Sequence, residues 1–102
     1  MKLFIVTCLK ELQKDVTKIF KDADIHAFSM AEVIGFRNNQ PVNMMESWFA
    51  GGDEKADSVM LFSFTAAENA ARGLDLVKEY NKKSETDFPV RAIIVPVEDT
   101  SF

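Results

Sequence analysis

The chain has 102 residues, a net charge of −4 and 47% hydrophobic residues. This length suits one domain with one modest core, and the composition is that of a globular protein. Acidic and basic residues are interspersed rather than gathered into a basic face, so we do not expect a nucleic-acid partner. The single Cys excludes an intramolecular disulfide and is typical of a reducing compartment. We therefore expect one cytoplasmic domain spanning residues 1–102.

The first predicted elements are a strand and an amphipathic helix. Residues 2–8 form a nearly continuous apolar run that is typical of a central strand. The run is too short for a signal peptide or a membrane span, so we expect no direct membrane insertion. The helix follows and is expected to end at Asp22-Ala23-Asp24, with lysines opposite its apolar face. Its apolar face comprises Leu9, Leu12, Val16, Ile19, Phe20 and Ala23, and its lysines are Lys10, Lys14, Lys18 and Lys21.

A second strand is predicted over residues 25–34, where large and small side chains alternate. The larger set is Phe28, Met30, Glu32 and Ile34, and the smaller set is Ala27, Ser29, Ala31 and Val33. We expect this strand to pack on helices on one side. Residues 37–57 then break every periodic pattern, with Asn38-Asn39, Pro41 and Gly51-Gly52. A stretch of about 20 residues without periodicity inside a small domain indicates a functional loop or a disordered segment.

The second half repeats the pattern of strand, helix and strand. Residues 58–64 predict a third strand, and Thr65-Ala66-Ala67-Glu68 predicts a capping box at the start of a helix. This helix is expected to end at residues 80–84 and to bury Ala67, Ala70, Ala71, Leu74 and Val77. Residues 90–97 predict a fourth strand, and Pro96 near its end favours a position at a sheet edge.

The element order β-α-β, long loop, β-α-β predicts the α+β class with the ferredoxin-like fold. Right-handed crossovers then give a four-stranded antiparallel sheet with both helices on one face. The other face has no cover within this chain. Its apolar residues, for which the Phe residues of the first and third strands are candidates, would need a partner, so we predict an oligomer.

The first 36 residues carry a pattern of motifs with a family resemblance. A Met-Lys start enters an apolar strand, the helix contains Asp15-Val16, an acidic break precedes Ile25, and the second strand ends Glu32-Val33-x-Gly35-Phe36. This pattern, with its spacing, resembles the PII signalling proteins. From residue 58 to 97 the chain is similar to the family in element order rather than in residues.

The resemblance implies a homotrimer in which ligands bind in clefts between subunits, under the long loop. PII proteins bind adenine nucleotides there and signal to a partner through the loop, and some divergent relatives accompany membrane transporters. Gly35, Phe36 and Arg37 are the ligand-binding candidates at the loop's start, since a Gly at a strand end lets backbone amides approach an anion closely. Lys55 is a candidate near the other end of the loop, where it would reach a phosphate or carboxylate.

The chain also differs from typical nucleotide-binding members of that family. Those members have Gly-Arg-Gln after Gly-Phe, where this chain has Arg37-Asn38-Asn39. Their Gly-rich phosphate loop is replaced by residues 82–89, which contain no Gly, and their Arg pair after the last strand is replaced by Glu98-Asp99. The standard ATP-binding residues are thus largely absent, so the ligand is not identified by the sequence and an adenine nucleotide is one candidate.

Other candidate chemistry is limited. One His, His26, and one Cys, Cys8, give no nucleophile–base pair, so we expect no enzyme. The loop contains Met44, Met45 and Trp48, which must bury somewhere. They would pack on a neighbouring subunit or their own sheet, dock a partner protein, or contribute thioether ligands to a Cu(I) site with His26 or Cys8.

Three functions therefore stay open. The first is a trimeric regulatory sensor whose ligand sets the conformation of the loop. The second is a copper-type metal-responsive protein of the related trimeric ferredoxin-like group. The third is an interaction module that binds no ligand.

Overall fold

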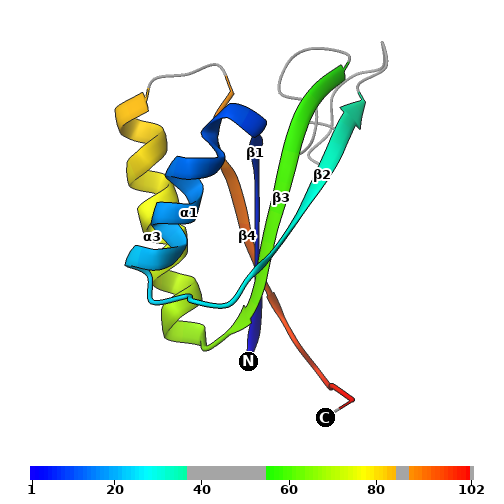
Figure 1. Ribbon diagram of the computed structural model, residues 1–102. Helices are drawn as coiled ribbons and strands as arrows, with labels where there is room; N and C mark the ends of the chain where they lie inside the picture. Colours follow the sequence, from blue (N-terminus) through cyan, green and yellow to red (C-terminus); the bar gives the residue numbers. More distant parts are fainter. Residues whose placement is uncertain (37–54, 85–87, 102) are drawn as a thin grey trace, which may run out of the picture.

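The computed structural model describes residues 1–36, 55–84 and 88–101 (Figure 1). The described strands form one antiparallel sheet in the order β2-β3-β1-β4, and both helices lie on one face of it. The predicted ferredoxin-like fold is therefore confirmed. The elements are β1 (Lys2–Leu9), the 3-10 turn η1 (Lys10–Leu12), α1 (Gln13–Asp22), β2 (Ser29–Phe36), β3 (Lys55–Thr65), α3 (Ala67–Ser84) and β4 (Arg91–Pro96).

The core lies between the sheet and the two helices. Alternate residues of β1 point toward the helices, and Phe4 at their centre is fully buried. The ring of Phe20 from α1 packs on Phe4 with centroids 5.3 Å apart, in a tilted geometry that aromatic pairs favour. The buried apolar residues are Phe4, Val6, Cys8, Val16, Ile19, Phe20, Ala23, Ile25, Val59, Leu61, Ala70, Val77 and Val90.

The first helix begins later than its apolar pattern suggests. Leu9 is the last residue of β1, and η1 turns the chain before α1 starts at Gln13. Leu9 fits the spacing of the apolar residues in the helix. Its backbone, however, pairs with Ser58 of β3, so it belongs to the sheet. The predicted end at residues 22–24 is confirmed, because α1 stops at Asp22 and Asp24 has a φ of 60°.

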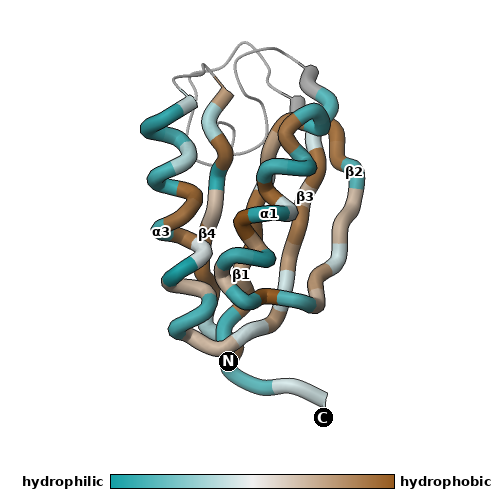
Figure 2. Tube along the Cα trace, turned by 60° about the vertical axis from the view of Figure 1, so that its left-hand side comes forward, coloured by the Kyte–Doolittle hydropathy of each residue, from teal (hydrophilic) through white to brown (hydrophobic). Residues whose placement is uncertain are grey.

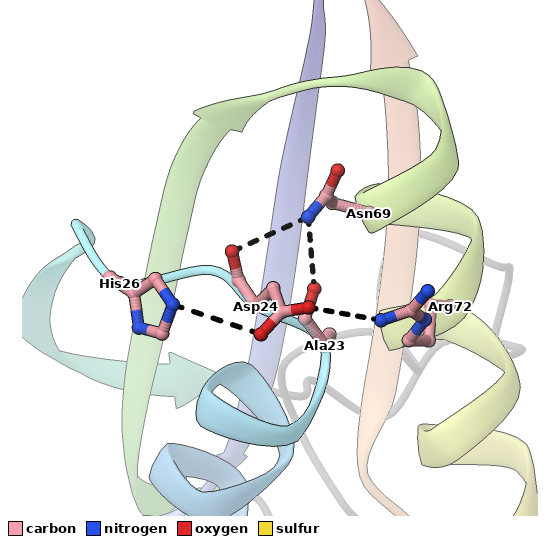
Figure 3. A network of polar contacts seen from close by, with 5 residues as sticks. All are labelled: Ala23, Asp24, His26, Asn69 and Arg72. Atoms are coloured by element: carbon pink, nitrogen blue, oxygen red, sulfur yellow. Dashed lines mark hydrogen bonds and ion pairs between the residues drawn. The ribbon is translucent and has the colours of Figure 1, made fainter.

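The turn after α1 is held by residues of α3 (Figure 3). The Nδ2 atom of Asn69 donates to the carbonyls of Ala23 and Asp24, at 3.1 and 3.3 Å. The carboxylate of Asp24 lies 3.2 Å from the guanidinium of Arg72 and 3.8 Å from the imidazole of His26. These bonds satisfy carbonyls at the helix end that have no partner within the helix. His26 thus stands in an exposed structural contact.

The second helix differs from its prediction in its cap and in its buried face. The Ala66 carbonyl accepts the Ala70 amide at 3.0 Å, so Ala66 holds the N-cap position and the capping box placed on Thr65 is wrong by one residue. The residues at 67 and 71 are exposed, and the buried line runs through Ala70, Gly73 and Val77. The Ala-rich sequence does not distinguish these neighbouring faces, because Ala fits either one.

The start of β4 is fixed by one side chain of α3. Asn81 donates from Nδ2 to the Val90 carbonyl at 2.8 Å, and its Oδ1 accepts the Val90 amide at 2.9 Å. The side-chain amide thus pairs with Val90 as a neighbouring strand would. From there β4 runs along β1 to the pair of Lys2 and Pro96, and the predicted edge position of Pro96 is confirmed.

The edge strand β2 is the main departure from the predicted packing. It begins at Ser29, so residues 25–28 are a connection, and it ends at Phe36. The helices lie over the other strands, and β2 stands beside them (Figures 1 and 2). Met30 and Ile34 point to the helix side yet are 46% and 51% exposed. The expectation that helices cover this strand is therefore wrong, because the two helices span only part of the sheet.

Gly73 gives a test of how closely α3 approaches the sheet. A Cβ at this position would lie 2.8 Å from two ring atoms of Phe4, which is fully buried and cannot move aside without cost. We expect Gly73→Ala to lower the free energy of unfolding by about 1–3 kcal/mol, despite the better helix propensity of Ala.

The matched control repeats Gly73→Ala in a Phe4→Leu background. In each background, the chains with and without Gly73→Ala are compared by urea denaturation. There the clash is removed, and the substitution should be neutral or stabilising by up to about 1 kcal/mol. Equal losses in both backgrounds would show that the Phe4 contact does not decide the cost.

Candidate functional site

The candidate site lies where β2 and β3 meet residues 37–54. In the sheet register Phe36 is opposite Lys55, and Gly35 is opposite Ala56. The backbone thus brings three of the predicted ligand-binding residues, Gly35, Phe36 and Lys55, to one end of the sheet. Lys55 and the two residues after it belong to β3 rather than to the loop predicted at 37–57.

An open depression adjoins this end of the sheet. It has a volume of about 410 Å³, and the described residues that line it are Leu9, Lys10, Glu11 and Asp57. The first three lie where β1 turns into η1, and Asp57 lies near the start of β3. The depression therefore combines an apolar side chain with charges of both signs, which can orient a polar ligand.

An ion pair crosses from η1 to β2 beside this depression. The Nζ atom of Lys10 lies 2.6 Å from Oε1 of Glu32. The hydrogen bond raises the pKa of Lys10 and lowers the pKa of Glu32, and Asp57 contributes further to the rise at Lys10. Both side chains are largely exposed, so the pair adds little to stability. Its importance is positional, since it connects the middle of β2 to the turn that follows β1.

The other predicted site residues, Arg37, Met44, Met45 and Trp48, lie outside the described residues. Their roles in ligand, partner or metal binding stay predictions. Within 1–36, 55–84 and 88–101, no three His, Cys, Asp or Glu side chains gather in a way that could hold a metal ion. None of the helices described is long and apolar enough to cross a membrane.

Sequence patterns do not identify Lys10, Glu11 and Asp57 as neighbours. The helical period places Lys10 on the solvated face of a regular helix, and the loss of periodicity places Asp57 in the loop. They come together because β1 pairs with β3 in a register that sets Leu9 opposite Ser58. The usable signal is the position of both segments at strand ends, next to the predicted loop.

Cys8 lies in the core beneath α1 and makes no contribution to this site. Its pKa is raised to about 11, mainly because the thiol is buried and also because the charge of Asp15 lies nearby. Asp15 itself accepts a hydrogen bond from the Tyr80 hydroxyl at 2.8 Å, between the two helices. The thiol is thus a small buried apolar group with little thiolate character.

The opposite face of the sheet carries an uncovered apolar surface. By strand alternation and register it is formed by Leu3, Ile5, Phe62, Phe64, Ile93 and Val95, which we call the open face. Phe64 is 57% exposed, and Ile93 and Val95 are exposed as well. The exposed Phe64 agrees with the prediction that Phe residues of the third strand lie on the uncovered face. The corresponding prediction for the first strand is wrong, because Phe4 points to the helices and is buried there.

No family model matches the chain, and no curated protein is significantly similar to it. Among solved structures, the chain is similar to the crystal structure of a "putative PII-like signaling protein" from Thermus thermophilus. The two share 16% identity with a TM-score of 0.61, over 91% of this chain and 82% of that one. At this identity the likeness shows the fold. The chain therefore has a divergent PII-like fold.

Cys8 also gives a prediction about alkaline pH. Its pKa is raised in the folded chain, so the unfolded chain loses the thiol proton first as the pH rises from about 9 toward 11. The stability that Cys8 contributes is present below pH 9 and is lost across this interval. We expect the urea midpoint to fall between pH 9 and 11, and to fall less in Cys8→Ala.

The companion measurement is the rate of thiol labelling. At pH 8 the native chain should react with an aromatic disulfide reagent at least tenfold more slowly than the urea-unfolded chain, since about one thiol in a thousand is then ionised. Equal labelling rates for the native and unfolded chains would contradict a buried, protonated thiol. The same conclusion would follow if the urea midpoints of wild type and Cys8→Ala changed identically with pH.

Proposed function

We propose that this chain is a trimeric PII-like regulatory protein of the cytoplasm. It binds a small ligand between subunits at the base of residues 37–54, and it signals to a partner protein, for which a membrane transporter is the first candidate. The observation that supports it most directly is the joining of three features at one end of the sheet. These are the paired ends of β2 and β3, the open depression, and the Lys10–Glu32 ion pair.

The open face supports the assembly. A sheet face with exposed Phe64, Ile93 and Val95 in one chain would lose contact with water if copies packed together. Closed symmetric oligomers are the usual way in which a soluble chain covers such a face. A trimer around this face would place the candidate site of each subunit near a neighbour.

The charges around the depression bear on the class of ligand. Glu32 and Asp57 both act on the ammonium group of Lys10, and Glu11 adds a third acid to the lining of the depression. A ligand with phosphate or carboxylate groups would therefore have to draw Lys10 away from Glu32. Further positive charge from residues such as Lys55 would assist it, since Lys55 enters β3 at the same end of the sheet.

Competition for Lys10 supplies a route for signalling. Glu32 is on β2, four residues before the strand ends at Phe36. When a ligand binds Lys10, Glu32 loses its ion-pair partner, and β2 loses one side-chain contact with the turn that follows β1. A ligand changes a conformational equilibrium only by binding one state more tightly. Here the favoured state is the one without the Lys10–Glu32 contact.

The ligand is tested by calorimetric titration with ATP, ADP, AMP and cyclic AMP. We expect at least one to bind, and we expect Lys10→Met to weaken that binding by about tenfold, the usual effect of losing one charged hydrogen bond. Lys78→Met on the exposed surface of α3 is the matched control and should leave binding unchanged. Failure of all four compounds to bind would exclude the nucleotide form of the proposal.

The assembly is tested by analytical ultracentrifugation. The wild-type chain should sediment with three chain masses. Phe64→Asp should shift it toward the monomer, because a carboxylate would be buried in the apolar interface. Ala71→Asp, on the exposed side of α3, should remain trimeric. A monomeric wild-type chain would overturn the proposed assembly.

A further inference from the structure

The connection that leads into β2 is fixed to the rest of the fold at three points. Ile25 is buried in the core. The hydroxyl of Ser63 in β3 donates a hydrogen bond to the Ala27 carbonyl at 2.6 Å. The ring of Phe28 packs on Phe20 of α1 with centroids 4.9 Å apart. The chain is therefore held by buried contacts up to the residue before β2 begins.

Beyond that point, β2 is held mainly by its backbone pairing with β3. Of the side chains at 29–34, that of Val33 is half-buried and the other five are exposed. The helices give β2 no cover, because they lie over the other strands (Figures 1 and 2). The Lys10–Glu32 ion pair adds a contact with η1, again between exposed side chains. A strand pair without a packed apolar face is only marginally stable in water.

The opposite edge strand, β4, is held differently. It also pairs with one neighbour in the sheet, β1. Its residues Ala92 and Ile94, however, pack against the core, and α3 lies against the strand. Opening β4 would expose this apolar surface to water, whereas opening β2 would add little to the surface that is exposed already. The free energy of local opening should therefore be lower at β2 than at β4.

We propose that β2 opens away from β3 as a unit, pivoting after Phe28, and that the Lys10–Glu32 ion pair stabilises the closed state. The rest of the described fold stays intact. Opening separates Phe36 from Lys55, so it takes apart the paired strand ends at which the candidate site lies. The inference adds a conformational equilibrium to that site, and it holds whether or not the proposed ligand and trimer are correct.

Native-state hydrogen exchange, followed by NMR in the full-length chain, tests the opening. Successive amides of an antiparallel strand point to opposite neighbours, so those of residues 58–62 in β3 alternate between β1 and β2. The amides bonded to β2 should exchange at least about tenfold faster than those bonded to β1. At the covered edge, the β4 amides bonded to β1 should exchange more slowly than the β2 amides bonded to β3. Equal rates for the alternate amides of β3 would overturn the proposal.

A core substitution separates local opening from global unfolding. Val77 is buried in α3, which packs on β1, β4 and α1, so its loss weakens the open and closed states alike. We expect Val77→Ala to accelerate the β1-bonded amides by about tenfold, because global unfolding becomes easier. The β2-bonded amides should keep their wild-type rates. If Val77→Ala accelerates both sets equally, β2 exchanges only through global unfolding and the proposal is wrong.

Removing the ion pair tests its part in the equilibrium. We expect Lys10→Met to accelerate the β2-bonded amides by about two- to fivefold, the range expected for one exposed ion pair. The matched control is Lys18→Met, which removes an ion pair with Asp22 inside α1 and should leave these rates unchanged. No acceleration in Lys10→Met, or the same acceleration in both variants, would show that the ion pair does not stabilise the closed state.

Ultracentrifugation of the same samples keeps this proposal apart from the proposed function. A monomeric chain with the alternating exchange pattern would overturn the trimer and support the opening of β2. A trimeric chain with uniform protection along β3 would support the trimer and overturn the opening.

Discussion

The close approach of α3 to β1 is the constraint on which the rest of the arrangement depends. Gly73 has no side chain, so the helix backbone lies directly over the ring of Phe4. This contact centres the helix layer on β1 and β4, and α1 then fills the space beside α3 with Phe20 against the same ring. Two helices seated in this way leave the outer strand β2 without cover. The exposure of Met30 and Ile34 is thus a direct result of where the layer is anchored.

Element order was sufficient to predict the sheet and its topology, but not which face of each strand is buried, since Phe4 was expected on the uncovered face and lies in the core. Nor could it predict the detailed placement of helices. Leu9 fits both a helix period and a strand end, and Ala67, Ala70 and Ala71 fit either side of a helix. A Gly at 73 reads as a weak point in a helix until its neighbour Phe4 is known.

The site was predictable to the extent that it depends on local sequence. The end of a strand at Gly35-Phe36 was predicted, whereas Lys55 was predicted within the loop and instead pairs with Phe36 as the first residue of β3. The meeting of Lys10, Glu32 and Asp57 depends on two separate strand registers and could not be read from spacing. The result is an ionic contact between the turn after β1 and the middle of β2.

The pairing of Asn81 with Val90 has a consequence for how the protein ages. Both bonds require an amide, one through its nitrogen and one through its oxygen. Hydrolysis of that amide to a carboxylate would remove the donor and set a negative oxygen against the Val90 carbonyl. One slow, spontaneous reaction at a helix end would thereby release the start of an edge strand. The start of this edge strand thus depends on a single side-chain amide.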